Sequence, residues 1–419
     1  MNIIAIDAPP GNIQYAKDYS AYQLLSLSAL PLLQPQYNPI HSVDIATSVA
    51  ECISSNDGKN IKLTINDDLY FSSGESVLAK HYIDGLEGLY KNNVFIRHFF
   101  QPRIIVQSQN KKCIKIKLSK RYPPIYDLLS SILWNPINKC RSDDIAGRYS
   151  VYQESKNYWK CTGNQYSRFD NPDFEIRLVK DPLDNIRLAR LGIITQTPDT
   201  ATPYEIESLD GFTLNRRASP LRAQLSFFST LANSENTKQR HLISDAVSEL
   251  NIANLVNWEN TKLLSDEPYV NKVTRRINTR VEQKPAIQKR SKRKGLTYTL
   301  AYDDYYPNAT IAYAIAQQLE QLGIEVTVIA DDFSSQKVSC DMRLNITHGL
   351  LPSVWGRYCG QLTSSIWKST PQYLEQYLRI LLSEDPIEIV SSKLDSILNK
   401  VCPSVQIGAV PSLYFIKEN

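Results

Sequence analysis

One stretch of the chain changes its hydrophobic period twice, in the way that separates strands from helices. Residues 296–300 alternate between apolar and polar positions, as in a half-buried strand. The apolar residues then recur at helical spacing, at Ile311, Ile315, Leu319 and Leu322. Asn308 is expected as the N-cap and Gly323 as the residue after the helix. Residues 324–328 alternate again, so the stretch 296–333 predicts a β-α-β unit with a crossover helix.

Shorter segments of both kinds follow one another along the rest of the chain. Strands are expected at 3–6, at 61–65, twice within 104–118, at 222–228 and at 405–416. Helices are expected at 18–33, after the turn at 71–75, from Pro123 to Leu133, at 236–252 and at 387–398. This mixture predicts an α/β protein.

Composition limits the classes that this protein can belong to. A chain of 419 residues with 42% hydrophobic and 21% charged residues is globular and long enough for two or three lobes. The first residues lack the basic and apolar regions of a signal peptide, and no apolar run reaches the length of a membrane span. The seven scattered cysteines favour a reducing compartment. We therefore expect either a cytoplasmic protein that begins at Met1, or a periplasmic or cell-surface protein whose leader was removed.

Catalytic and metal-binding motifs are not found in the sequence. It contains no GxSxG, HExxH, P-loop or GxGxxG motif, and its cysteines form no CxxC pair. We expect no catalytic residue, no cofactor and no metal, and the sequence favours a binding protein over an enzyme. The segment 272–294 carries ten Lys or Arg and one acid, Glu282, but no aromatic residue that would stack on bases. A solvated loop is favoured there, and a nucleic-acid partner is not expected.

Four segments carry a resemblance to a known family. They are IKLTINDDLYFSSGESVLAKHYIDGLEGLY at 61–90, IAGRYSV at 145–151, RAQLSFF at 222–228 and the β-α-β stretch at 296–333. In this order they resemble the family 5 extracellular solute-binding proteins, the dipeptide, oligopeptide and nickel receptors of bacterial ABC importers. The chain looks like a divergent and shortened member without a signal peptide. Asn66-Asp67 and His81 stand where the family has Arg-Gly and Asp.

The resemblance implies a fold and a division into domains. It implies a two-lobed periplasmic-binding-protein-like α/β fold, of type II and similar to cluster C, with a small inserted third domain. Lobe one would comprise 1–33, 147–228 and 404–419. The inserted domain would comprise 34–146, and lobe two 229–403.

Candidate ligand-binding residues follow from the same resemblance. Trp355, Arg357, Tyr358 and His348 lie just beyond the expected strand that contains Asn345, where peptide receptors place a Trp and an Asp that neutralises the ligand's ammonium group. No Asp occurs in 347–358, so Arg357 would favour an anionic group and Trp355 would form an apolar wall. Apart from the resemblance, Thr195, Asp199 and Thr200 follow an expected strand in lobe one, at a strand end where ligands of open α/β sheets bind. Tyr19, in the helix expected at 18–33, is a further candidate. The alternative for each is a role in packing or in a turn.

The function that the resemblance implies is the capture of a small polar or peptide-like ligand. Two lobes would close on the ligand by a hinge formed near 225–228 and near the end of the chain. The protein is expected to be a monomer. If it is exported, it would deliver the ligand to an ABC importer permease. The alternative is a solute-binding fold recruited as an enzyme or accessory protein of a biosynthetic pathway, or as a ligand sensor.

Overall fold

The computed structural model describes most of the chain. It describes residues 2–418 apart from 15, 17, 36, 41, 142, 168, 170, 201–205, 218, 220, 249, 251–255, 257–294, 332–337, 349–353 and 411. The basic segment 272–294 therefore lies outside the described residues. Within the described residues, no helix is both long and apolar enough to cross a membrane.

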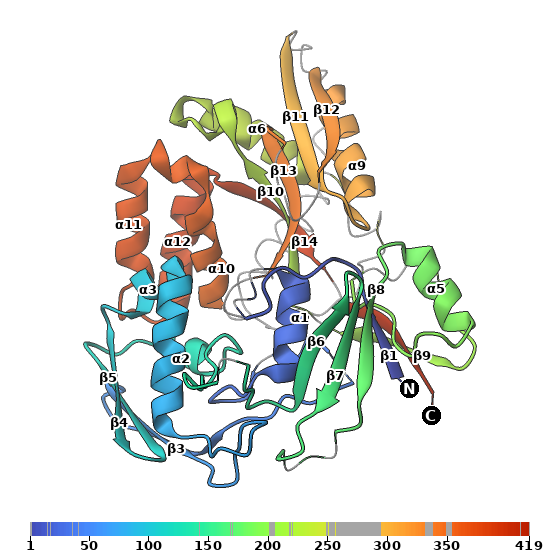
Figure 1. The fold of residues 1–419 in the computed structure, drawn as a ribbon. Coiled ribbons are helices and arrows are strands. Elements are labelled where there is room, and N and C mark those ends of the chain that lie inside the picture. The colour runs from blue at the N-terminus through green and yellow to red at the C-terminus, as the bar shows by residue number, and fades with distance from the viewer. Residues whose placement is uncertain are drawn as a thin grey trace. The chain divides into compact units, whose positions relative to one another are not determined.

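The chain divides into two compact units (Figure 1). Unit 1 comprises residues 1–179, 187–197 and 350–355, and unit 2 comprises 180–186, 198–349 and 356–419. The domain boundaries expected from the sequence stay a prediction.

Unit 1 contains two sheets and the helices packed on them. One sheet has the order β1-β8-β7-β6, with β1 parallel to β8 and the other pairs antiparallel. The other has the order β2-β3-β5-β4 and is antiparallel throughout. The elements are β1 (Asn2–Ile6), α1 (Tyr19–Ser28), β2 (Val49–Ser54), β3 (Asn60–Ile65), α2 (Ala79–Asn92), α3 (Val94–Phe100), β4 (Ile104–Asn110), β5 (Cys113–Leu118), α4 (Ile125–Leu129), β6 (Tyr149–Ser155), β7 (Tyr158–Gly163) and β8 (Phe174–Leu178).

Helix α1 packs on the first of these sheets. Asp18 caps its N-terminus, because its Oδ1 accepts a hydrogen bond of 2.8 Å from the backbone N–H of Ala21. Leu24 and Leu27 join Trp159 and Ile176 in a buried apolar cluster. The helix ends at Ser28 because Ala29 is extended, so the expected length to Leu33 is wrong by about a turn.

Unit 2 is built on a five-stranded mixed sheet. Its order is β12-β11-β13-β10-β14, and a separate pair joins β9 to β15. The elements are β9 (Phe212–Arg217), β10 (Leu221–Phe227), η1 (Ser229–Ala232), η2 (Ser234–Asn236), α6 (Thr237–Ser248), β11 (Leu296–Asp303), α9 (Asn308–Gln321), β12 (Ile324–Asp331), β13 (Met342–His348), α10 (Val354–Gly360), η3 (Gln361–Thr363), η4 (Ser365–Lys368), α11 (Pro371–Leu381), α12 (Ile387–Val401), β14 (Ser404–Ala409) and β15 (Ser412–Lys417). Helix α5 (Pro182–Arg190) has residues in both units.

The β-α-β unit expected at 296–333 is confirmed. Strands β11 and β12 pair in parallel over their whole length, and α9 connects them. Gly323 follows the helix with φ +76°, a left-handed conformation that suits glycine. The expected N-cap is wrong, since Pro307 holds that position and Asn308 is the first helical residue. The Asn308 amide instead donates to the backbone carbonyl of Asp303 over 3.0 Å.

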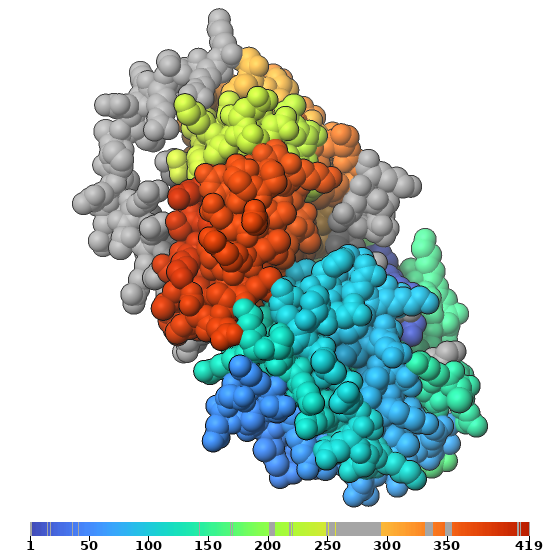
Figure 2. All heavy atoms as spheres, turned by 90° about the vertical axis from the view of Figure 1, so that its left-hand side faces the viewer, coloured from blue at the N-terminus to red at the C-terminus, as the bar shows by residue number. Residues whose placement is uncertain are grey.

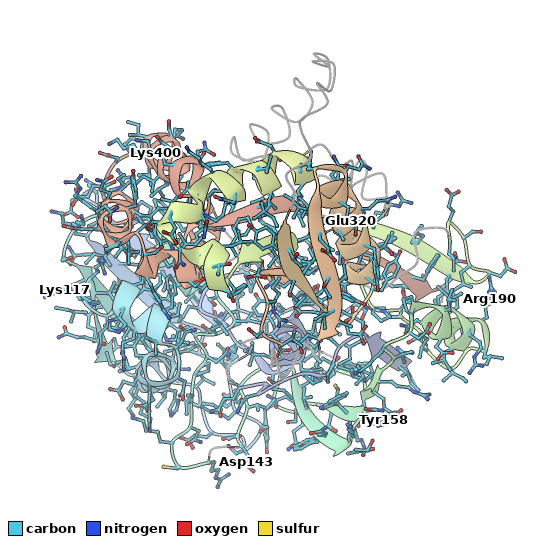
Figure 3. All side chains as sticks on the ribbon, turned by 90° about the horizontal axis from the view of Figure 1, so that it is seen from above. Lys117, Asp143, Tyr158, Arg190, Glu320 and Lys400 are labelled. Atoms are coloured by element: carbon cyan, nitrogen blue, oxygen red, sulfur yellow. The ribbon has the colours of Figure 1, made fainter. Side chains whose placement is uncertain are left out.

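Helices α11 and α12 near the C-terminus pack against each other in unit 2. They lie in the red area of Figure 2, and Lys400 of α12 is labelled in Figure 3. The helix expected at 387–398 is confirmed as α12, one turn longer than expected. The helix expected from Pro123 is much shorter, because α4 ends at Leu129.

Candidate functional site

One face of the five-stranded sheet of unit 2 is polar. Strand β10 alternates strictly, with Leu221, Ala223, Leu225 and Phe227 buried at 1% exposure or less and the residues between them half-buried. The half-buried residues of β10 pair with polar residues of β13. The pairs are Arg222 with Thr347, Gln224 with Asn345 and Ser226 with Arg343. Gln406 of β14 pairs with Gln224 on the other side. Because directly paired residues share a face, these side chains form one polar face.

The centre of this polar face is a row of three carboxamides on adjacent strands. Gln406 Nε2 donates to Gln224 Oε1 over 2.9 Å, and Gln224 Nε2 contacts the Ser226 hydroxyl at 3.1 Å. Asn345 completes the row on β13. Its Oδ1 is buried and accepts no hydrogen bond from any described residue. An unsatisfied buried acceptor is unfavourable by about 1–3 kcal/mol, so a donor that reached this oxygen would be favoured.

A buried ionic cluster lies at one end of the same face. Asp303 and Asp331 are the last residues of the parallel strands β11 and β12, and they pair with each other in the register. Arg343 Nη1 donates to Asp303 Oδ1 over 2.8 Å, and its Nη2 donates to Asp331 Oδ2. The exposed fraction of each of the three side chains is 6% or less. In open α/β sheets, ligands bind outside the carboxyl ends of the strands, which is where this cluster lies.

The cluster carries one more negative than positive charge when all three groups are ionised. Burial raises the pKa of the Asp303 carboxyl to about 6, against the opposing effect of the Arg343 guanidinium. Burial lowers the pKa of Arg343, but its hydrogen bond to the Asp331 carboxylate and the charge of Asp303 more than offset this, so its pKa is raised. Arg343 therefore stays charged, while the Asp303 carboxyl binds a proton more readily than an ordinary aspartate does. Asp303 Oδ2 also accepts no hydrogen bond from a described residue.

The carboxamides of this face suit the recognition of amide groups. Each carboxamide presents a donor and an acceptor together, which matches the N–H and C=O of a peptide group. The described residues contain no nucleophile paired with a base on this face, and no group of three or more His, Cys, Asp or Glu that could hold a metal ion.

Two residues predicted for the site in lobe one have clear structural contacts. The Thr195 hydroxyl accepts from the N–H of Ile3 and donates to its carbonyl, at 3.1 and 3.0 Å. Asp199 is buried, with its Oδ2 3.2 Å from the Ser412 hydroxyl and its carbonyl accepting from Leu413 N–H over 2.7 Å. Each contact attaches a loop to a neighbouring strand. Their predicted ligand role stays a prediction.

The predicted residues of α10 are all buried. Tyr358 is fully buried, and its hydroxyl donates to Asp395 Oδ1 of α12 over 2.8 Å. The Arg357 guanidinium lies 5.0 Å from the centre of the Tyr358 ring, a cation–π contact. Trp355 is 7% exposed and Arg357 is 9% exposed. These residues contribute to packing, and their predicted contact with a ligand stays a prediction.

The remaining predicted residues are spread over both units. Tyr19 is the first residue of α1, and its hydroxyl lies 2.7 Å from the Tyr37 hydroxyl. Thr200 is half-buried beyond Asp199. His348 ends β13, where its backbone pairs with Leu221, and its side chain lies outside the described part of the structure. Asn345 is the predicted residue that the structure places in the carboxamide row.

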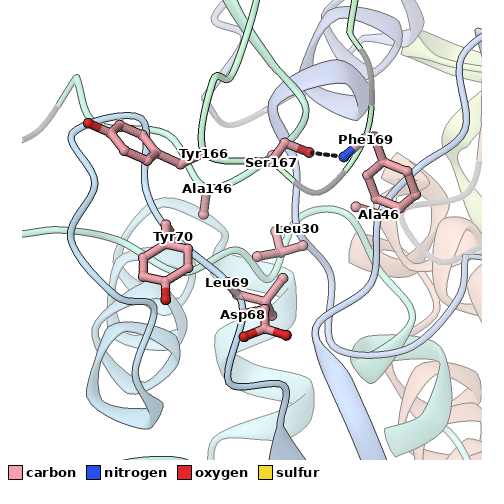
Figure 4. A pocket seen from close by; sticks show the side chains of 10 residues that line it. Leu30, Ala46, Asp68, Leu69, Tyr70, Ala146, Tyr166, Ser167 and Phe169 are labelled. Atoms are coloured by element: carbon pink, nitrogen blue, oxygen red, sulfur yellow. Dashed lines mark hydrogen bonds between the residues drawn. The ribbon is translucent and has the colours of Figure 1, made fainter.

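Unit 1 contains a separate small pocket (Figure 4). Aromatic rings of Tyr70, Tyr166 and Phe169 line it together with the Asp68 carboxylate, and the Ser167 hydroxyl accepts from Phe169 N–H at 3.4 Å. None of the residues predicted for the ligand site lines this pocket.

Sequence reasoning did not identify Gln224, Gln406, Asp303, Asp331 or Arg343 as site residues. A signal was present in β10, where polar residues alternate with fully apolar ones in a strand that pairs on both sides. The register that unites five strands comes only from the structure.

Comparisons with known proteins bear on the fold. No family model matches the sequence, and no curated protein matches it. Solved structures do match over nearly the whole chain. The murein tripeptide binding protein MppA of Escherichia coli is 14% identical, with 99% of this chain and 94% of that chain covered and a TM-score of 0.78.

Two further structures match to a similar extent. NikZ from Campylobacter jejuni, in complex with Ni(L-His), is 17% identical, with 100% of this chain and 94% of that chain covered and a TM-score of 0.76. DppA from Helicobacter pylori, in complex with the peptide STSA, is 13% identical, with 99% and 93% covered and a TM-score of 0.75.

These matches define the class of fold first. The chain is a mixed α/β protein with a periplasmic-binding-protein-like fold. Within that class, the fold is that of the peptide and nickel receptors that form the family 5 solute-binding proteins. The resemblance found in the sequence is thus confirmed at the level of the fold.

Proposed function

We propose that this protein is a solute-binding protein that captures a small polar ligand with amide groups, such as a short peptide. The observation that carries the proposal is the Asn345 Oδ1 acceptor, which lies unsatisfied among the described residues in a row of carboxamides. A peptide N–H would satisfy this oxygen, and the neighbouring glutamines would pair with further peptide groups.

The fold supports the same proposal by analogy. Structures with this fold include a tripeptide-binding protein and a receptor in complex with the peptide STSA. By this analogy the protein would deliver its ligand to an ABC importer permease. The enclosure of the ligand between two lobes by hinge closure stays a prediction.

The first test is to search the purified protein for a bound small molecule by native and denaturing mass spectrometry. A discrete extra mass that disappears on denaturation, and that fragments as a peptide or an amide, supports the proposal. A retained molecule without amide groups contradicts it.

A variant test addresses the carboxamide row directly. Trialanine binding is measured by calorimetry for the wild type, for Asn345→Leu and for the control Gln372→Leu, whose side chain is exposed on α11. We expect Asn345→Leu to weaken binding at least tenfold without lowering the midpoint of thermal unfolding, because it removes an unsatisfied acceptor. Equal binding by Asn345→Leu and the control would refute the role of the row.

A further inference from the structure

The antiparallel sheet β2-β3-β5-β4 of unit 1 has two chemically different faces. Its inner face is apolar, since Ile61, Leu63 and Ile65 of β3 and Ile114, Ile116 and Leu118 of β5 are all buried. The residues between them point to the outer face. On β3 and β5 these include Lys62, Lys115 and Lys117.

The strand register brings these lysines together. Lys62 pairs directly with Lys115 across the two central strands, and Lys117 lies two residues along β5 on the same face. Directly paired side chains in an antiparallel sheet have Cβ atoms about 4.5–5.5 Å apart, and like charges at that distance are unfavourable. In the described part of the chain, none of the three lysines forms an ion pair. Folding therefore maintains a positive cluster at some cost to stability.

Isoleucines flank the lysines on both edge strands. Ile53 of β2 pairs with Lys62, and Ile105 of β4 pairs with Lys117. Their exposed fractions are 49% and 59%, high values for large apolar side chains. Lys62 and Lys117 are exposed and Lys115 is half-buried. The outer face thus combines a central row of positive charge with apolar side chains at its margins.

The sequence around this sheet is basic as well. Residues 59–121 contain twelve Lys or Arg against five Asp or Glu. Glu51 of β2 lies on the outer face opposite Thr64, beside the lysines rather than among them. In Figure 3, Lys117 lies at the periphery of the drawn side chains.

We propose that the outer face of the β2-β3-β5-β4 sheet is a docking surface for a membrane rich in anionic phospholipid. Lysine is depleted at the centre of protein–protein interfaces, which argues against an acidic protein as the partner. Anionic headgroups attract clustered lysines without requiring that each be paired. The flanking isoleucines reach the boundary between headgroups and acyl chains, as the apolar residues of peripheral membrane elements do. This surface belongs to unit 1, whereas the carboxamide row belongs to unit 2, and the proposal does not depend on the proposed ligand.

The test is co-sedimentation of the full chain with vesicles. Vesicles of phosphatidylglycerol mixed with phosphatidylcholine are compared with vesicles of phosphatidylcholine alone. We expect binding to the anionic vesicles alone, and a loss of binding when salt rises from about 0.1 M to about 1 M, because the screening length falls from about 10 Å to about 3 Å.

A triple variant and a charge-matched control identify the surface. Lys62→Gln, Lys115→Gln and Lys117→Gln together should weaken binding on the order of 100-fold, since each lysine near such a surface contributes about a factor of five. The control replaces the exposed Lys156, Lys180 and Lys400 by Gln, which changes the net charge equally, and should bind as the wild type does.

Ile105→Ser gives a second measurement in which all lysines are kept. We expect it to weaken vesicle binding several-fold while far-UV circular dichroism stays unchanged. Equal losses in the triple variant and the charge-matched control would attribute binding to net charge and overturn the proposal. The absence of vesicle binding by the wild type would also overturn it.

Discussion

The buried ionic cluster of unit 2 makes a specific prediction about stability and pH. Asp303 is fully buried, is bonded to Arg343 at 2.8 Å and has a pKa raised to about 6 by burial. In the unfolded chain, the same carboxyl has a pKa near 3.8. We consider the substitution Asp303→Asn, which keeps the shape of the side chain and mimics its neutral, protonated form.

The sign follows from the direction of the pKa shift. A carboxyl whose pKa is raised in the folded state binds its proton more tightly there, so its contribution to stability grows as pH falls from about 6 towards 4. The difference between a pKa of about 6 in the folded protein and 3.8 in the unfolded chain adds roughly 3 kcal/mol to the free energy of unfolding once the pH is below both values. About 2 kcal/mol of this is gained between pH 7.5 and pH 4.5. Asn at this position does not titrate and lacks this dependence.

The assay is urea unfolding of the wild type and of Asp303→Asn at both pH values. Other carboxylates titrate in both proteins, so the informative quantity is the difference between their free energies of unfolding. We expect the wild type to gain about 2 kcal/mol relative to the variant when pH falls from 7.5 to 4.5.

A control and a refuting result complete the design. Asp385→Asn removes an exposed carboxylate that forms an ion pair with Lys393. The difference between its free energy of unfolding and that of the wild type should change by less than about 0.5 kcal/mol between pH 7.5 and pH 4.5. If the wild type instead loses stability relative to Asp303→Asn on acidification, the ion pair with Arg343 outweighs burial and the reasoning is wrong.

Two further predictions concern packing. Trp355→Ala should lower the free energy of unfolding by about 3–5 kcal/mol, because this side chain is only 7% exposed; a change in ligand affinity with unaltered chemical denaturation would instead show that Trp355 is a binding residue. Gly85→Ala should destabilise the protein by several kcal/mol, because a Cβ there would lie 1.8 Å from the backbone oxygen of Asn135. Gly88→Ala, three residues further along α2, is the control. Its Cβ would meet only the flexible tip of Ile137 at 3.2 Å, so this substitution should be nearly neutral. Thermal and urea unfolding check both, and equal effects of the two glycine substitutions would contradict the second prediction.

The local pattern of the sequence was sufficient for the β-α-β unit and for the resemblance to the solute-binding family. Both depend on short-range features, namely the change of period at 296–328 and the motifs at 61–90 and 222–228. Errors arose at the ends of elements. Asn308 is not the N-cap of α9, and α4 ends at Leu129, because caps and ends depend on contacts that the local pattern does not contain.

The sequence by itself therefore determined the class of fold, since hydrophobic periodicity and turn residues act over a few neighbours. The candidate site was decided by tertiary structure. The carboxamide row spans more than 180 residues of chain, from Gln224 to Gln406, with Asn345 between them in sequence. These residues meet only because β10 pairs with both β13 and β14 in one register. Likewise, Lys62 and Lys115 form a positive cluster only through the pairing of β3 with β5. Register is a property of the assembled sheet, in which a slip of one residue would move every side chain to the other face.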